Sequence, residues 1–153
     1  MSLVAILAMP RPESWNFPLF LHVLGAMILV GGLLTATSAL AFAKGEVRLL
    51  RLGYWTLLAV ALPGYVIMRI GAQWVASKGW DEVDPAPTWL DIGYTVADAG
   101  AVLMLIALVV GGIGMRRLRD GRGQGLLKAT LVIALVILAA ALVAVWAMAG
   151  KPN

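Results

Sequence analysis

The chain has 153 residues, of which 61% are hydrophobic and 13% are charged, whereas soluble domains carry about 45–50% apolar and about 25% charged residues. Polar side chains are too few to cover a soluble globule, which excludes a water-soluble enzyme and a disordered linker, and the lack of cysteine excludes a disulfide scaffold. The net charge of +4 does not indicate nucleic-acid binding, because the basic residues lie mainly in short segments between apolar runs.

Four apolar segments are long enough to cross a bilayer, which takes about 20 residues. Before them, the short apolar run 3–9 is broken by Pro10 and Pro12, and we expect an arm at the membrane surface and not a signal peptide. The predicted spans cover about residues 17–43, 52–75, 89–115 and 125–149. Because the connections are short and leave no room for a soluble domain, we expect residues 1–153 to form a single all-α domain, a four-helix transmembrane bundle.

The basic residues predict the orientation of this bundle. Three of them, Arg11, Lys78 and Lys151, lie on the side of the two termini, and eight lie in or beside the first and third connections. These eight are Lys44, Arg48, Arg51, Arg116, Arg117, Arg119, Arg122 and Lys128. Since cytoplasmic loops are enriched in basic residues, we expect the first and third connections inside and both termini outside (N-out, C-out).

Small residues and one proline indicate how the helices pack. Gly31 and Gly32 lie on a small-residue face of the first helix, and Gly93 and Ala97 on one of the third. Such faces let helices approach closely in a membrane, and we expect a homo-oligomer or a larger membrane complex as partner, besides the lipid bilayer. Pro63 lies in the middle of the second helix and should kink it.

Three ionisable residues lie too deep for the membrane interface. Counted from the polar limits of each helix, His22 is about 10 Å from the centre of the bilayer, and Arg69 and Asp98 are each roughly 7 Å from it. All three are displaced toward the outer leaflet and come from three different helices. Charged groups at such depth usually face the bundle interior and mark functional sites.

The spacing of neighbouring polar residues predicts which of them meet. Tyr65, Arg69 and Gln73 recur every four residues on one face of the second helix, as Tyr94 and Asp98 do on the third. We therefore expect an Arg69–Asp98 ion pair, which is favourable inside a bundle only when further hydrogen bonds support it.

Several functions fit such a cluster. The leading hypothesis is a small polytopic membrane protein with an outer-leaflet polar pocket that binds a ligand or cofactor. Haem b is one possible cofactor, with His22 on the iron and Arg69 near a propionate. The alternatives are a structural or accessory subunit with a buried ion pair, and a transporter of a small solute or ion. Nothing indicates a catalytic set, and a non-enzyme is favoured, because there is no acid pair and no serine near His22 in depth.

The segment FLHVLGAMILVGGLL, residues 20–34, resembles the first helix of a group of uncharacterised bacterial four-helix membrane proteins. It is similar, more distantly, to membrane proteins of the copper-resistance-D type. The matching residues are Leu21-His22-Val23-Leu24-Gly25 and Gly31-Gly32. The resemblance implies a compact bundle in the bacterial inner (cytoplasmic) membrane with His22 at a candidate site, and it implies no activity.

Overall fold

The computed structural model describes residues 13–78 and 88–150, and within these ranges it is helical with no strand. Four helical segments are each long and apolar enough to cross a membrane. The prediction of an all-α chain with four long apolar helices is thereby confirmed, and these helices indicate an integral membrane protein. The expected arm at residues 3–9 and most of the second connection lie outside the described residues.

Each span is built from one to three elements. The first contains η1 (Glu13–Trp15) and α2 (Asn16–Phe42), and the second contains α3 (Val47–Thr56), η2 (Leu57–Ala61) and α4 (Leu62–Ala76). The third contains α5 (Thr88–Arg117) and η3 (Leu118–Asp120), and the fourth is α6 (Gln124–Gly150).

The second span begins at Val47, well before the expected boundary near Leu52. Hydropathy marks only the apolar part of a helix, whereas the first turn of this helix also carries charge, with Leu50 buried and Arg48 exposed. The connection shrinks to a tight turn in which Lys44 and Gly45 have φ angles of 45° and 91°, and the Glu46 amide donates to the Ala43 carbonyl at 2.7 Å. Glycine reaches such a φ without strain.

The helix geometry changes just before Pro63, the residue predicted to kink the second helix. Residues Leu57–Ala61 form a π-helix, and the Leu62 amide donates to the carbonyl of Leu57, five residues earlier. Proline has no amide hydrogen and its ring crowds the carbonyl four residues before it, so the helix widens just ahead of Pro63.

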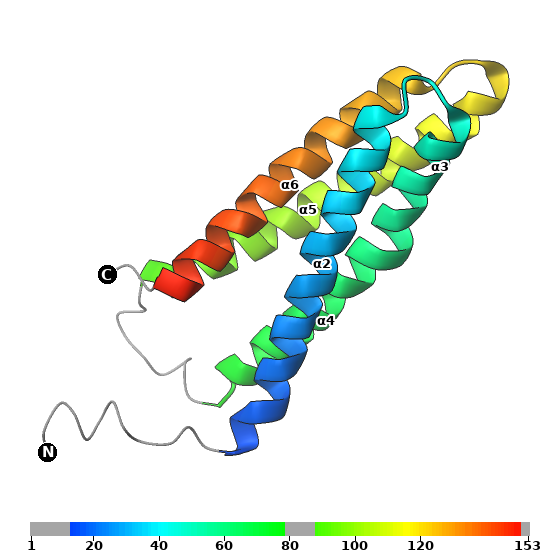
Figure 1. The fold of residues 1–153 in the computed structure, drawn as a ribbon. Helices are drawn as coiled ribbons and strands as arrows, with labels where there is room; N and C mark the ends of the chain where they lie inside the picture. Colours follow the sequence, from blue (N-terminus) through cyan, green and yellow to red (C-terminus); the bar gives the residue numbers. More distant parts are fainter. Residues whose placement is uncertain (1–12, 79–87, 151–153) are drawn as a thin grey trace, which may run out of the picture.

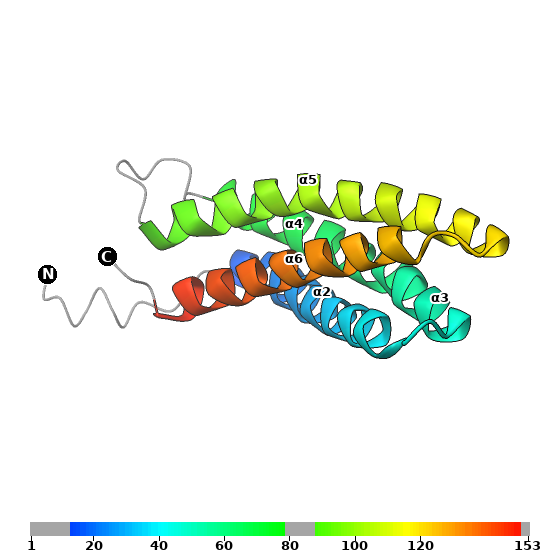
Figure 2. The same ribbon diagram turned by 90° about the horizontal axis from the view of Figure 1, so that it is seen from above.

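The helices form two hairpins, α2 with α3–η2–α4 and α5 with α6 (Figures 1 and 2). We call the end with the two turns, 43–46 and 118–123, the basic end, and the opposite end the terminal end. The buried cluster shared by the two hairpins lies in the basic half, and its largest side chains include Leu33, Leu57, Met104 and Leu127. Toward the terminal end the hairpins lean apart in Figure 1, and the buried glycines there, Gly25, Gly64, Gly71 and Gly93, pack against residues of their own hairpin.

Within the first hairpin, α2 and α4 are in direct backbone contact along a seam of glycines. A Cβ added to Gly25 would strike the backbone of Met68, and one added to Gly71 would strike the backbone of His22. On Gly64 it would lie 2.6 Å from the Leu29 nitrogen, and on Gly32 2.9 Å from the Ala61 nitrogen. The seam therefore depends on residues without a side chain.

We predict that Gly25→Ala destabilises the protein by about 1–3 kcal/mol, because two backbones must separate to admit the methyl group. The matched control is Gly31→Ala, since a Cβ on Gly31 would meet nothing within 4 Å. Thermal unfolding in detergent, followed by circular dichroism, measures both. Equal stability of the two variants would contradict the close contact of α2 and α4.

Candidate functional site

The predicted ion pair between α4 and α5 is present in the structure. The Nη2 atom of Arg69 donates to Oδ1 of Asp98 at 2.6 Å, and this is the only salt bridge among the described residues. The side chain of Arg69 is 28% exposed and that of Asp98 is 66% exposed. The pair is therefore formed, but its carboxylate lies largely open.

Two tyrosines complete the group around this pair. The guanidinium carbon of Arg69 lies 5.5 Å from the centre of the Tyr94 ring, within the range of a cation–π interaction. The Tyr65 hydroxyl does not support the ion pair, since it donates to the backbone carbonyl of Ala97 at 3.0 Å. We call Tyr65, Arg69, Tyr94 and Asp98 the polar cluster.

The polar cluster connects the two hairpins in the terminal half of the bundle. Gly93 of α5 packs against Met148 of α6, and Gly71 of α4 packs against His22 of α2, so both glycines face partners in their own hairpin. Between α4 and α5, Tyr65 forms a hydrogen bond to Ala97 and Arg69 forms one to Asp98. Long polar side chains therefore take the place of an apolar core here.

His22 lies on the other side of α4, within the glycine seam. Its Nδ1 atom is 3.1 Å from the backbone carbonyl of Met68. A carbonyl only accepts, so Nδ1 carries the hydrogen in this contact, and Nε2 of a neutral ring keeps its lone pair. No contact between His22 and Arg69 or Asp98 is present, and the structure thus separates His22 from the polar cluster.

The remaining sequence candidate, Gln73, is exposed one turn beyond Arg69, and its side chain forms no hydrogen bond with the cluster. The described residues hold no group of three or more His, Asp or Glu side chains that could bind a metal ion. Sequence reasoning missed the carbonyls of Met68 and Ala97 as partners, because backbone acceptors leave no mark in residue types.

Comparison of the chain with models of known families, with curated proteins and with solved structures finds no match. The resemblance of residues 20–34 to bacterial four-helix membrane proteins therefore stays a prediction.

A double-mutant cycle tests whether Arg69 and Asp98 interact in the membrane. Either single change, Arg69→Leu or Asp98→Leu, should lower stability because it leaves one charge without its partner at membrane depth. The double change removes both charges. We expect its loss of stability to be smaller than the sum of the two single losses by at least about 0.5 kcal/mol. Strictly additive losses, measured by thermal unfolding in lipid nanodiscs, would show that the pair contributes no coupling.

Proposed function

We propose that this is a small polytopic membrane protein that binds a polar ligand at the polar cluster, with the basic end in the cytoplasm and the terminal end outside. The orientation rests on the basic residues, eight near the two turns against three near the termini. In this orientation the ligand reaches the cluster from the outer side.

The observation that carries this proposal is the incomplete coordination of Asp98. Oδ1 is paired with Arg69, but the described residues offer no second partner to the carboxylate, and the side chain is 66% exposed. A bare carboxylate oxygen against lipid at this depth is costly. Water, a ligand or another subunit must therefore cover it.

The arrangement of the hairpins favours water and a ligand. The shared apolar core lies in the basic half, and in the terminal half the side chains of Tyr65 and Arg69 cross from α4 to α5. Ordered polar groups set between helices are an ordinary basis of ligand sites in helix bundles.

The chemistry of the cluster indicates the kind of ligand. The Arg69 guanidinium has five N–H donors and uses one of them on Asp98, so it can also hold an anionic group. Oδ2 of Asp98 can accept from a hydroxyl, an amine or a cation. A small ligand with an acidic group for Arg69 and a hydrogen-bond donor for Asp98 would satisfy both residues. The Tyr94 ring, which lies beside Arg69, would restrict where this ligand can bind.

Because the chain has no cysteine, accessibility of the cluster can be measured with single cysteine variants. We expect Asp98→Cys to react with a charged, membrane-impermeant thiosulfonate reagent added from outside. Val102→Cys is the control, since Val102 is exposed, lies one turn deeper on the same face, and should be shielded by lipid. If both cysteines stay unmodified, the open polar site is refuted, and the structural-subunit alternative is favoured.

Ligand binding itself is tested with small zwitterionic amino acids as probes, which carry a carboxylate for Arg69 and an ammonium group for Asp98. Stabilisation of the wild-type protein that saturates with concentration, and that is lost in both Arg69→Gln and Asp98→Asn, is the expected result. Equal stabilisation of all three proteins would show that the probe acts elsewhere.

Haem b is a second candidate ligand, and the contact of His22 favours it. Histidines that bind a metal usually donate their other ring nitrogen to a backbone carbonyl or carboxylate, as His22 does to Met68. The close seam leaves no space for a porphyrin between α2 and α4, so the ring would have to approach His22 from outside the seam. Arg69 directly follows Met68 in the chain, and its guanidinium can form an ion pair with a haem propionate.

This candidate predicts an α band of a b-type haem in the dithionite-reduced spectrum of protein expressed with a haem precursor. The band should vanish in His22→Asn, which keeps a donor for the Met68 carbonyl but supplies no imidazole. Gln73→Ala is the control and should keep the band. A flat spectrum from folded, haem-supplied protein would exclude haem b while leaving the polar ligand site untouched.

Transport has less support from the arrangement. Among the described residues, no acidic or basic side chain lies on α5 between Asp98 and Arg116, or between Arg51 and Arg69 in the second span. The polar cluster therefore has no ionisable continuation toward the basic end.

A further inference from the structure

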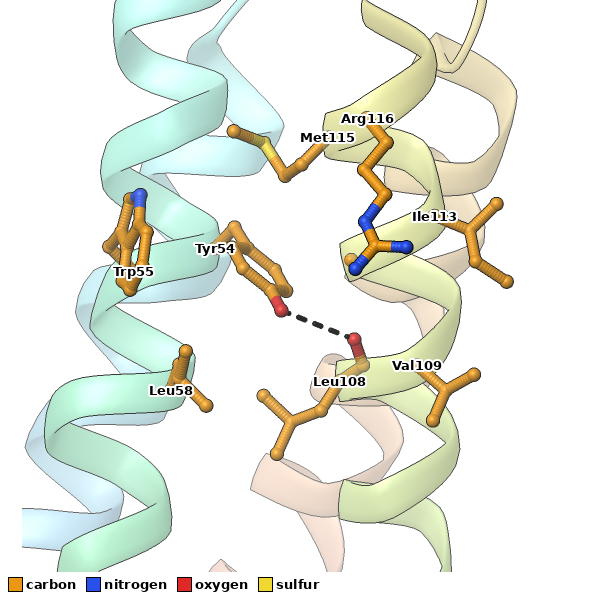
Figure 3. A pocket seen from close by; sticks show the side chains of 9 residues that line it. Tyr54, Trp55, Leu58, Leu108, Val109, Ile113, Met115 and Arg116 are labelled. Atoms are coloured by element: carbon orange, nitrogen blue, oxygen red, sulfur yellow. Dashed lines mark hydrogen bonds between the residues drawn. The ribbon is translucent and has the colours of Figure 1, made fainter.

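A groove opens between the two hairpins at the basic end, far from the polar cluster. It is formed by two overlapping hollows of about 450 and 520 Å³ between α3 and α5. Trp55, Met115 and Arg116 belong to both hollows, so they form one continuous surface (Figure 3). The groove is apolar toward the middle of the helices and basic toward their ends.

The floor of the groove is Tyr54. A Cβ added to Gly111 would lie 2.8 Å from a carbon of the Tyr54 ring, so the ring packs directly against this glycine. The Tyr54 hydroxyl donates to the Leu108 carbonyl oxygen at 3.4 Å. Figure 3 shows this side chain spanning the space between α3 and α5. The two helices are thereby held apart by a side chain, and a shallow hollow remains on the side that faces the bilayer.

The apolar part of the groove is lined by Leu58 and by Val109 and Ile113, which are exposed. Trp55 forms one wall and is 57% exposed. Indole rings at this height favour the membrane interface, because they combine an apolar body with one N–H donor. An acyl chain can lie along these residues while the indole meets the headgroup region.

The basic part of the groove is lined by Arg51, Arg116 and Arg119. None of these arginines forms an ion pair among the described residues. Figure 3 shows the Arg116 side chain directed back along α5 into the groove. A guanidinium has five N–H donors, and when it lies beside apolar side chains without a paired anion it favours the binding of an anionic group.

The acidic residues nearby do not fill this role. Glu46 precedes α3 and Asp120 ends η3, and both are exposed without an ion pair. The other charged groups of this end are basic. The groove therefore presents a net positive charge beside an apolar channel.

We propose that this groove binds an anionic glycerophospholipid of the leaflet at the basic end. The phosphate lies between Arg51, Arg116 and Arg119, which bind it through paired N–H donors. One acyl chain lies over Leu58 and Val109. A positive pocket between spanning helices, open to the bilayer, is the form that binding sites for such headgroups take.

The test is native mass spectrometry of the detergent-purified full chain, titrated with phosphatidylglycerol and with phosphatidylcholine of the same acyl chains. We expect retention of phosphatidylglycerol and little of phosphatidylcholine. The triple variant Arg51→Gln, Arg116→Gln and Arg119→Gln should bind phosphatidylglycerol about a hundredfold more weakly, and Arg116→Gln alone about fivefold.

The matched control changes three arginines of the same end that do not line the groove, in Arg48→Gln, Arg117→Gln and Arg122→Gln. It removes the same charge and should lose at most a few-fold in affinity. Equal losses in the two triples would mean diffuse attraction and overturn the site, as would equal binding of the two lipids.

Inorganic phosphate separates a lipid from a free anion. Phosphate that displaces phosphatidylglycerol from the wild-type protein at millimolar concentration would assign the arginines to a soluble anion and overturn the lipid proposal. Helix content by circular dichroism is compared for all variants. If the groove triple does not fold, Arg116→Gln decides, since unchanged phosphatidylglycerol binding in that variant would also overturn the proposal.

Discussion

The backbone contact between α2 and α4 determines where the polar groups of the terminal half point. Gly64, Met68 and Gly71 face α2 along this contact. Successive residues of a helix are turned by about 100°, so Tyr65 and Arg69, each one position further, are directed toward α5. The same contact places the ring of His22 beside the Met68 carbonyl. The glycine seam therefore separates His22 from Arg69, although both lie at the same level of the bundle, His22 beside the Met68 carbonyl and Arg69 next to Met68 in the chain.

The distribution of apolar packing explains why the bridge between the hairpins is polar. Large side chains such as Leu33, Leu57 and Met104 fill the space between the hairpins in the basic half. In the terminal half the fully buried positions are mostly glycine, alanine and proline, and the glycines among them bring the helices of one hairpin together. Tyr65 and Arg69 are long enough to cross, and they end on acceptors of α5.

The sequence predicts the four spans and the Arg69–Asp98 pair because both depend on how far along the membrane normal each residue lies. Hydropathy places each helix along the membrane normal, and within that frame Asp98 is the carboxylate at the level of Arg69. Rotation about each helix axis is harder to predict, and it decides that His22 meets Met68. The spacing of seven between Gly25 and Gly32, and between Gly64 and Gly71, carries a signal for this rotation. The groove at the basic end depends on where α3 begins and on the position of Tyr54, which no residue pattern specifies.

The two polar regions differ in what they need from their surroundings. At the polar cluster one cation and one anion are already paired, so the group is neutral as a whole, and what it lacks is a partner for one open oxygen. Near the basic end three arginines lie together without a carboxylate, so that region lacks an anion. A neutral, partly open pair suits a ligand that binds reversibly, since replacing the ligand by water leaves no net charge at the site. A cluster of unpaired guanidinium groups suits a resident anion, and the bilayer itself supplies anionic headgroups at that level.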